Sequence, residues 1–237
     1  MDGAIICIHG AGGGGWEYAK WEPIFTAAGY SVIANDLRPS PAGLAATQFD
    51  DYVAQVTNWL PPDEPIILVG ASMGGILALK VAERIRPAAL VLVNSVPPAG
   101  VGAPRIGKQY PPIIPWANGT LAETQSALFD SDAATIRWAW PQWRDEAGAV
   151  LNQIAAGIPA RPPSCPTLVV LGDQDTDIPY QTGLALAAWA GADVFLYHGM
   201  SHVGPLLSQR AAEVAQAILG WLQPRLRSDK LTSPVTN

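Results

Sequence analysis

Residues 66–75 read IILVGASMGG. A run of branched apolar residues ends at Gly70, and apolar residues at helical spacing follow Gly74. Residues 70–74 fit the motif G-x-S-x-G, in which a serine lies on a strained turn between a buried strand and a helix. Small residues are needed because strand and helix pass close together, and the strained conformation exposes the serine hydroxyl. Ser72 is therefore the candidate nucleophile, although a glycine-rich chain can also form this pattern as an ordinary turn.

The composition is that of a globular protein. The chain has 237 residues, of which 49% are hydrophobic and 14% are charged. This length suits one α/β domain with room for an insertion, and the apolar content leaves little material for disordered regions. The net charge is −6 and no lysine- or arginine-rich block occurs, which argues against partners such as nucleic acid or an anionic membrane.

Cysteines and the N-terminus give no sign of secretion. Cys7 and Cys165 lie in or beside apolar runs and lack metal-ligand spacing, so we expect reduced residues of the core and no metal site. The N-terminus has an acidic residue where a signal peptide is basic, and its apolar run is short. No apolar run approaches the length of a membrane span, so we expect a cytoplasmic protein.

Short apolar runs alternate with segments of helical periodicity along most of the chain. The expected strands are residues 4–8, 31–34, 66–69, 90–93, 167–171 and 194–197, and the expected helices fall within 21–28, 49–60, 76–85, 182–190 and 209–222. Fully apolar strands separated by helices are typical of a parallel sheet that helices cover on both faces. The predicted fold class is therefore α/β, with right-handed crossovers in one mainly parallel sheet.

The alternation breaks in a stretch bounded by prolines. The sequence therefore predicts a core of residues 1–95 and 165–224 and an insertion of residues 96–164. Residues 225–237 are expected to form a polar, frayed tail. Within the insertion we expect helices near 132–138 and 141–156. Its tryptophans are candidates to line a pocket, because they offer rigid apolar area, or else they pack the insertion onto the core. These residues are Trp116, Trp138, Trp140 and Trp143.

Residues 10–15, which read GAGGGG, support two interpretations. They fit G-x-G-x-x-G after a strand, and Asp36 ends the next strand, as in a dinucleotide-binding loop. Alternatively, His9-Gly10-Ala11 opens a loop whose backbone N–H groups face a developing negative charge. The second interpretation is favoured because a histidine precedes the loop and the G-x-S-x-G motif follows. In addition, no tyrosine is followed four positions on by lysine, the pair that short-chain dehydrogenases use.

A serine hydroxyl is a poor nucleophile until a base accepts its proton, and the base needs an acid to orient it. Of the three histidines, His9 opens the glycine loop and His198 lies at a strand end, where structural roles suffice. His202 lies in the loop after the last strand, where parallel-sheet enzymes place site residues. His202 is therefore the candidate base.

The acid is expected in the loop after Leu171. Asp173, Asp175 and Asp177 all lie within reach, so spacing alone does not select one of them. The resulting chain order of serine, aspartate and histidine matches the order expected of α/β-hydrolases.

Four ordered motifs resemble those of the α/β-hydrolase superfamily over residues 4–222. They are HGAGGGGW at 9–16, GASMGG at 70–75, LGDQDTDIP at 171–179 and GMSHVG at 199–204. The start of the chain is similar to the compact esterase and hydroxynitrile lyase branch. The resemblance implies the α/β-hydrolase fold, with residues 96–164 as a helical lid.

The same resemblance implies roles for individual residues. In the family's G-x-x-D-x-x-x-P pattern the acid is Asp175, with Pro179 matching the proline. The oxyanion donors would be the backbone N–H groups of Ala11 and Met73. The implied protein is a serine hydrolase without a cofactor, which cleaves a small or medium carboxylic ester through an acyl-enzyme on Ser72.

Substrate and oligomeric state stay open, because loops and lid set the pocket on this fold. Alternatives are a C–C hydrolase, a lyase, an acyltransferase, or a sensor that binds a small ligand without turnover. The lyase branch would be expected to add a lysine close to the catalytic histidine, and the neighbours of His202 in the sequence include none.

Overall fold

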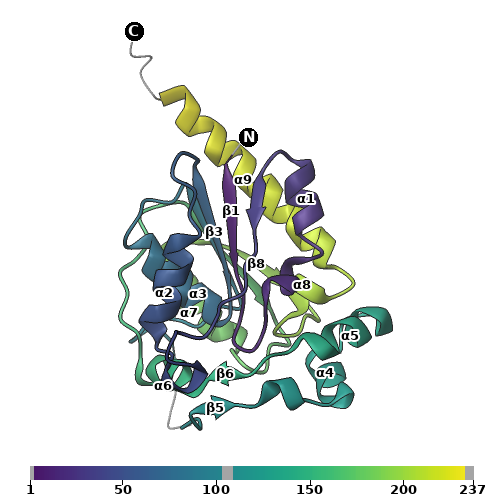
Figure 1. Ribbon diagram of the computed structural model, residues 1–237. Coiled ribbons are helices and arrows are strands. Elements are labelled where there is room, and N and C mark those ends of the chain that lie inside the picture. The colour runs from purple at the N-terminus through teal and green to yellow at the C-terminus, as the bar shows by residue number, and fades with distance from the viewer. Residues whose placement is uncertain (1–2, 103–108, 233–237) are drawn as a thin grey trace.

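The computed structural model describes residues 3–102 and 109–232. Six strands form one sheet in which all pairings are parallel, in the order β2-β1-β3-β4-β7-β8 (Figure 1). They are β1 (Ala4–Ile8), β2 (Ser31–Ile33), β3 (Ile66–Ala71), β4 (Ala89–Val93), β7 (Thr167–Gly172) and β8 (Asp193–Tyr197). Each of these strands overlaps a run predicted from the sequence, and the parallel sheet confirms the predicted fold class.

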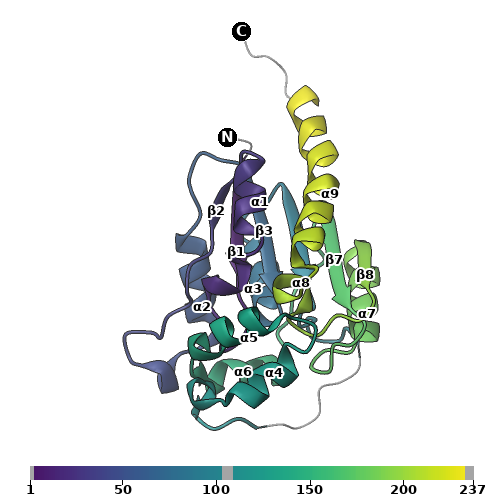
Figure 2. The same ribbon diagram turned by 90° about the vertical axis from the view of Figure 1, so that its right-hand side faces the viewer.

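Helices cover both faces of this sheet. One face packs against α2 (Phe49–Asn58), α3 (Met73–Ala82) and α7 (Tyr180–Ala190), and the other against α1 (Glu22–Ala27), α8 (Gly204–Leu207) and α9 (Ala211–Thr232) (Figures 1 and 2). Along β1, Ile6 and Ile8 join the first core, while Ile5 and Cys7 join the second. Burial on both sides explains why the central strands are apolar at every position.

The last helix is longer than the sequence predicts. The sequence predicts a frayed tail from residue 225, but α9 continues through Pro224 to Thr232. Arg225 anchors this extension, because its guanidinium lies 4.4 Å from the ring centroid of Trp221 and 2.7 Å from a carboxylate oxygen of Asp193 in β8. Residues 233–237 of the predicted tail lie outside the described residues.

Residues 96–164, called the inserted segment below, contribute no strand to the main sheet over their described part. They form α4 (Leu121–Ala127), α5 (Ala133–Ala139), α6 (Gly148–Ala156) and an antiparallel pair of short strands, β5 (Ile113–Ile114) and β6 (Glu146–Ala147). Figures 1 and 2 place these elements beyond one end of the sheet. Residues 103–108 lie outside the described residues.

The helices of the inserted segment match the predictions only in part. The sequence predicts a helix over 141–156, but α6 begins at Gly148, because β6 pairs with β5 just before it. Helix α4 is not among the predicted helices, although it starts with a capping box between Thr120 and Glu123. Short 3-10 helices complete the fold at Gly15–Tyr18, Leu44–Ala46, Trp116–Asn118 and Trp140–Gln142. Over residues 3–102 and 109–232, the helices are too short or too polar to cross a membrane.

Candidate active site

Ser72 lies on a strained turn between β3 and α3. Its φ of 52° and ψ of −118° fall in a region that residues with a side chain rarely adopt. The crossing of strand and helix is tight: a Cβ added at Gly74 would lie 2.0 Å from the carbonyl oxygen of Ile8 in β1, and one at Gly70 would lie 2.2 Å from the carbonyl oxygen of Gly74. The glycines of the motif are therefore required by space, and the ordinary-turn alternative does not describe this geometry.

His202 follows β8 and is hydrogen-bonded to Asp175, which follows β7. His202 Nδ1 lies 2.7 Å from Asp175 Oδ2, and the Asp175 side chain is shielded from solvent. The other carboxylate oxygen of Asp175 accepts the backbone N–H groups of Asp177 and Ile178, each at 2.8 Å. Three hydrogen bonds thus fix this carboxylate.

The other two aspartates do not form a hydrogen bond with His202 among the described residues: Asp177 lines the cavity that contains Ser72, and Asp173 pairs with a different histidine. Asp173 accepts hydrogen bonds from His198 Nδ1 at 2.8 Å and from the N–H of Gly199 at 2.7 Å. The His198 side chain is 83% exposed, compared with 15% for His202. The hydrogen bond to His198 holds the pKa of Asp173 below its usual range. Of the three candidates, Asp175 is the one that contacts His202.

One cavity brings the predicted residues together. A hollow of about 410 Å³ is lined by Ser72 and His202, by both candidate oxyanion donors, Ala11 and Met73, and by apolar side chains of the inserted segment. Met73 is the first residue of α3, so its N–H is among those that a helix leaves without an internal partner. Within the described residues, the Ser72 hydroxyl and His202 share this cavity without a hydrogen bond between them, which is common in sites without substrate.

The charge state of His202 depends on its neighbours. Burial by itself would lower the pKa of His202, but the hydrogen bond that His202 donates to Asp175 and the charges of Asp175, Asp177 and Glu17 outweigh burial and raise it above the ordinary value of 6.5. Glu17 lies in the 3-10 helix after the glycine loop and is only 2% exposed. Burial raises the pKa of Glu17 to about 7, although the hydrogen bond from Gly10 N–H and the His202 and Arg144 charges oppose the shift.

His9 is a neutral structural residue. Its Nε2 accepts the backbone N–H of Leu37 at 2.9 Å, so the proton lies on Nδ1 and is donated to the carbonyl oxygen of Gly10 at 2.7 Å. Burial lowers its pKa to about 4. The structural role expected for His9 agrees with these contacts.

The glycine loop does not present its amides as a dinucleotide site would. The N–H of Gly10 donates to the Glu17 carboxylate at 3.2 Å, and the N–H of Gly12 donates to the Glu146 carboxylate at 2.9 Å. Asp36 accepts the N–H of Gly15 at 2.9 Å. A pyrophosphate needs such amides free and would be repelled by these acids, so the contacts argue against the dinucleotide interpretation.

The four tryptophans of the inserted segment separate into different places. Trp116 lines the cavity with Ser72 and His202. Trp138 and Trp143 stack edge-on against Trp16, with ring centroids 5.6 and 5.0 Å apart, and Trp140 donates its indole N–H to Gly119 at 2.7 Å. Of the four candidates, Trp116 therefore lines the cavity that holds Ser72 and His202, and Trp138, Trp140 and Trp143 lie outside this cavity.

Sequence reasoning missed three charged residues beside the site: Glu17, Arg144 and Glu146. The one local signal for Glu17 is its position as a single acid between two aromatic residues, Trp16 and Tyr18. The other two carry no local signal, because their partners in the glycine loop lie more than 130 residues away in the sequence. For metal binding, residues 3–102 and 109–232 contain no cluster of three histidine, cysteine or acidic side chains that could hold an ion.

A model of the Alpha/beta hydrolase family matches residues 5–217. The chain is 32% identical over 116 residues to salicylic acid-binding protein 2 of Nicotiana tabacum and 35% identical over 92 residues to polyneuridine aldehyde esterase of Rauvolfia serpentina. The alignments cover 45% and 35% of this chain and 45% and 34% of the relatives, so the chain spans less than half of the curated relatives it matches.

Solved structures extend the likeness to nearly the whole fold. Tomato methylketone synthase I, crystallised with 2-tridecanone, superimposes with a TM-score of 0.74 over 95% of this chain and 99% of that chain, at 17% sequence identity. At this identity the likeness shows a shared fold.

Proposed function

Because the chain belongs to the alpha/beta hydrolase family, we propose that it is a serine hydrolase that cleaves a small or medium carboxylic ester through an acyl-enzyme, without a cofactor. The observation that carries this proposal is the buried hydrogen bond between Asp175 and His202, which faces the same cavity as Ser72 on its strained turn. The name of one relative, polyneuridine aldehyde esterase, supports ester hydrolysis as the reaction class.

In the proposed mechanism, the Ser72 hydroxyl attacks the ester carbonyl while His202 accepts its proton. Nε2 is the acceptor, since Nδ1 is held by Asp175. The carbonyl oxygen becomes an oxyanion, which receives hydrogen bonds from the N–H groups of Ala11 and Met73. The imidazolium then protonates the departing alcohol, and the acyl group stays on Ser72.

The second half of the reaction repeats these steps with water. His202 takes a proton from a water molecule, the hydroxide attacks the acyl-enzyme, and the proton returns to Ser72 as the carboxylic acid leaves. The carboxylate of Asp175 stabilises the imidazolium formed in both halves. A raised pKa of His202 suits its role as the acid, since the imidazolium must persist long enough to protonate the alcohol.

The size and lining of the cavity support a proposal for the substrate class. At about 410 Å³ it fits a small or medium ester, and Val96, Trp116, Leu151 and Ile154 give it an apolar wall. Thr176 and Asp177 line it on the side of His202. We therefore propose a substrate with an apolar acyl or alcohol part that contacts the inserted segment.

The test is a chain-length series of p-nitrophenyl esters with the wild type and Ser72→Ala. We expect serine-dependent turnover, with Ser72→Ala losing at least about 10³-fold while keeping its melting temperature. Full activity in Ser72→Ala would refute the proposal. If the folded wild type hydrolyses none of the esters, the proposed esterase function gives way to that of a lyase, C–C hydrolase or acyltransferase.

A non-catalytic sensor is a second candidate, because one relative is named as a salicylic acid-binding protein. A sensor predicts that a small aromatic acid raises the melting temperature without being consumed. Turnover of an ester that depends on Ser72 would exclude a sensor without catalysis.

A further inference from the structure

Residues 10–13 of the glycine loop have little stiffness of their own. Gly12 has a φ of 70°, and a Cβ added there would lie 2.4 Å from Cε3 of Trp116, so glycine is required. Glycine is the residue with the most backbone freedom, and a donor on such a loop is held in place only by contacts from elsewhere. Within the loop, the N–H of Gly13 donates to Gly10 at 3.3 Å, a long hydrogen bond.

Contacts from the inserted segment supply the missing restraint. The N–H of Gly12 donates to Glu146 Oε2 at 2.9 Å, and its carbonyl oxygen accepts the backbone N–H of Arg144 at 2.8 Å. The Arg144 Nε donates to the carbonyl oxygen of Gly13 at 2.7 Å. With Gly10 N–H bound to Glu17, the N–H of Ala11 is the one amide of residues 10–13 without a hydrogen-bond partner among the described residues.

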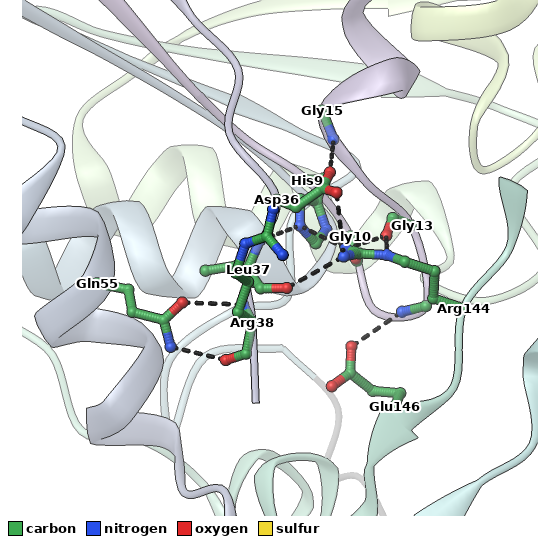
Figure 3. A network of polar contacts seen from close by, with 11 residues as sticks. His9, Gly10, Gly13, Gly15, Asp36, Leu37, Arg38, Gln55, Arg144 and Glu146 are labelled. Carbon is green, nitrogen blue, oxygen red and sulfur yellow. Dashed lines mark hydrogen bonds and ion pairs between the residues drawn. The ribbon is translucent and has the colours of Figure 1, made fainter. Parts of the chain in front are cut away.

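The Arg144 guanidinium connects the glycine loop to His9 and Leu37, as Figure 3 shows. Besides Gly13, its guanidinium donates to the carbonyl oxygen of Leu37 at 3.2 Å and to His9 Nε2 at 3.1 Å, and it lies 3.4 Å from a carboxylate oxygen of Asp36. A planar guanidinium with five N–H groups can hold several acceptors at once, which a lysine ammonium on a flexible stem cannot match.

Glu146 is itself fixed from two sides. Its Oε1 accepts the Tyr52 hydroxyl at 2.7 Å and the backbone N–H of Ala147 at 2.7 Å, and the residue is only 3% exposed. Burial and the nearby Glu146 carboxylate raise the pKa of Tyr52, so its hydroxyl keeps the proton that it donates. The Oε2 that holds Gly12 therefore occupies a fixed place.

Building on the proposed hydrolase function, we propose that Arg144 and Glu146 are positioning residues that hold the glycine loop so that the Ala11 N–H meets the oxyanion. Neither side chain contacts the oxyanion in this proposal, and both act through Gly12 and Gly13. The neighbouring Asp145 is a matched control, because its carboxylate accepts the N–H of Ala117 within the inserted segment at 3.0 Å and makes no hydrogen bond to the glycine loop.

The test compares Glu146→Leu, Glu146→Gln, Arg144→Met and Asp145→Asn by kcat and KM on the preferred ester. Loss of one oxyanion donor lowers kcat by about 10²–10³-fold, so a misplaced one should lower it by about 10–100-fold with KM within about threefold. Glu146→Gln should recover most of kcat, since an amide oxygen can still accept the Gly12 N–H. Asp145→Asn should match the wild type. A folded Glu146→Leu or Arg144→Met with wild-type kcat, or a loss confined to KM, would overturn the proposal.

A second readout separates this proposal from the proposed function. Amide hydrogen exchange of a peptide covering residues 9–16 should accelerate by at least about tenfold in Glu146→Leu and Arg144→Met, but not in Asp145→Asn. This measurement requires no substrate. If the wild type hydrolyses no ester and exchange in the variants still accelerates, the restraint of the loop by Arg144 and Glu146 (the clamp) is supported and the proposed hydrolase function is refuted. Unchanged exchange in both variants would overturn the clamp whatever the activity. If Glu146→Leu fails to fold, Arg144→Met and Glu146→Gln decide the matter by the same two readouts.

Discussion

Asp175 contacts His202 through a hydrogen bond of 2.7 Å from which solvent is excluded, whereas the parallel pair of Asp173 and His198 lies at the surface. The two pairs have almost the same length and differ in their surroundings. A carboxylate that is buried and fixed by backbone N–H groups can orient an imidazole throughout a reaction, and a surface pair competes with water and salt.

Asp175→Asn is therefore expected to lower kcat/KM by roughly 10³–10⁴-fold, because an amide would favour the wrong tautomer of His202. Steady-state kinetics on the preferred ester checks this expectation. Asp173→Asn is the matched control and should keep activity within about threefold. Near-normal activity in Asp175→Asn would show that another residue orients the His202 imidazole.

The pH dependence of kcat/KM should reflect the surroundings of His202. A general base must be neutral, and a raised pKa keeps His202 protonated to higher pH, so activity should fall as the pH drops through a value above 6.5. The Glu17 charge stabilises the imidazolium, so Glu17→Gln should move this acidic limb to lower pH. A limb that stays in place in Glu17→Gln would show that the two groups are not coupled. The exposed Glu22→Gln controls for the loss of one negative charge.

Glu17 should also make stability depend on pH. Its pKa is raised from 4.5 to about 7, so the folded state retains a proton that the unfolded chain releases. The resulting stabilisation is complete below about 4.5 and is lost as the pH rises through about 7, with an upper bound of roughly 3 kcal/mol. The unfolding free energy of Glu17→Gln relative to wild type should therefore increase between pH 5 and pH 8, as measured in urea. A constant difference across that range would contradict the shift.

The tight crossing at Ser72 predicts a steric effect at Gly74. A Cβ there would lie 2.0 Å from backbone oxygen of β1, so Gly74→Ala should destabilise by about 1–3 kcal/mol or more, as overpacked sites do. Gly220→Ala in α9 is the control, because a Cβ there meets nothing within 4 Å. It should stabilise the helix by about 0.5–1 kcal/mol. Equal melting temperatures for the two variants would be the contrary result.

Trp116 should set the preferred chain length. It lines the cavity, so Trp116→Ala should shift the optimum of a p-nitrophenyl ester series toward longer acyl chains and raise KM for short ones. Trp138→Ala, which removes a ring stacked on Trp16 away from this cavity, should leave the optimum unchanged. The same shift in both variants would mean that it arises from loosening of the inserted segment.

Local sequence patterns predicted the elements whose residues are buried on every side. The strands are recognisable because both faces are buried. The turn at Ser72 is recognisable because the approach of β1 requires glycine at position 74 and the start of α3 requires glycine at position 70. Choosing Asp175 among three acids required the resemblance to a family, since the fold that turns it toward His202 is not local.

Other features depended on contacts between distant parts of the chain. Residues 144–147 carry no strand pattern, and their extended course comes from partners in the glycine loop and β5. The extension of α9 past Pro224 depends on Arg225 meeting Asp193 of β8. Propensity predicts the end of a helix at such a place, and tertiary contacts override it.

The hydrogen bond between Gly12 and Glu146 joins residues 134 positions apart. The first strand and its loop leave the ribosome long before their partners in the inserted segment exist. A nascent chain can therefore form β1 and the turn at Ser72 while the loop beside them is still unrestrained. The loop is fixed only when residues 144–146 dock, so a chain truncated before Arg144 should contain Ser72 but lack a fixed place for the Ala11 amide.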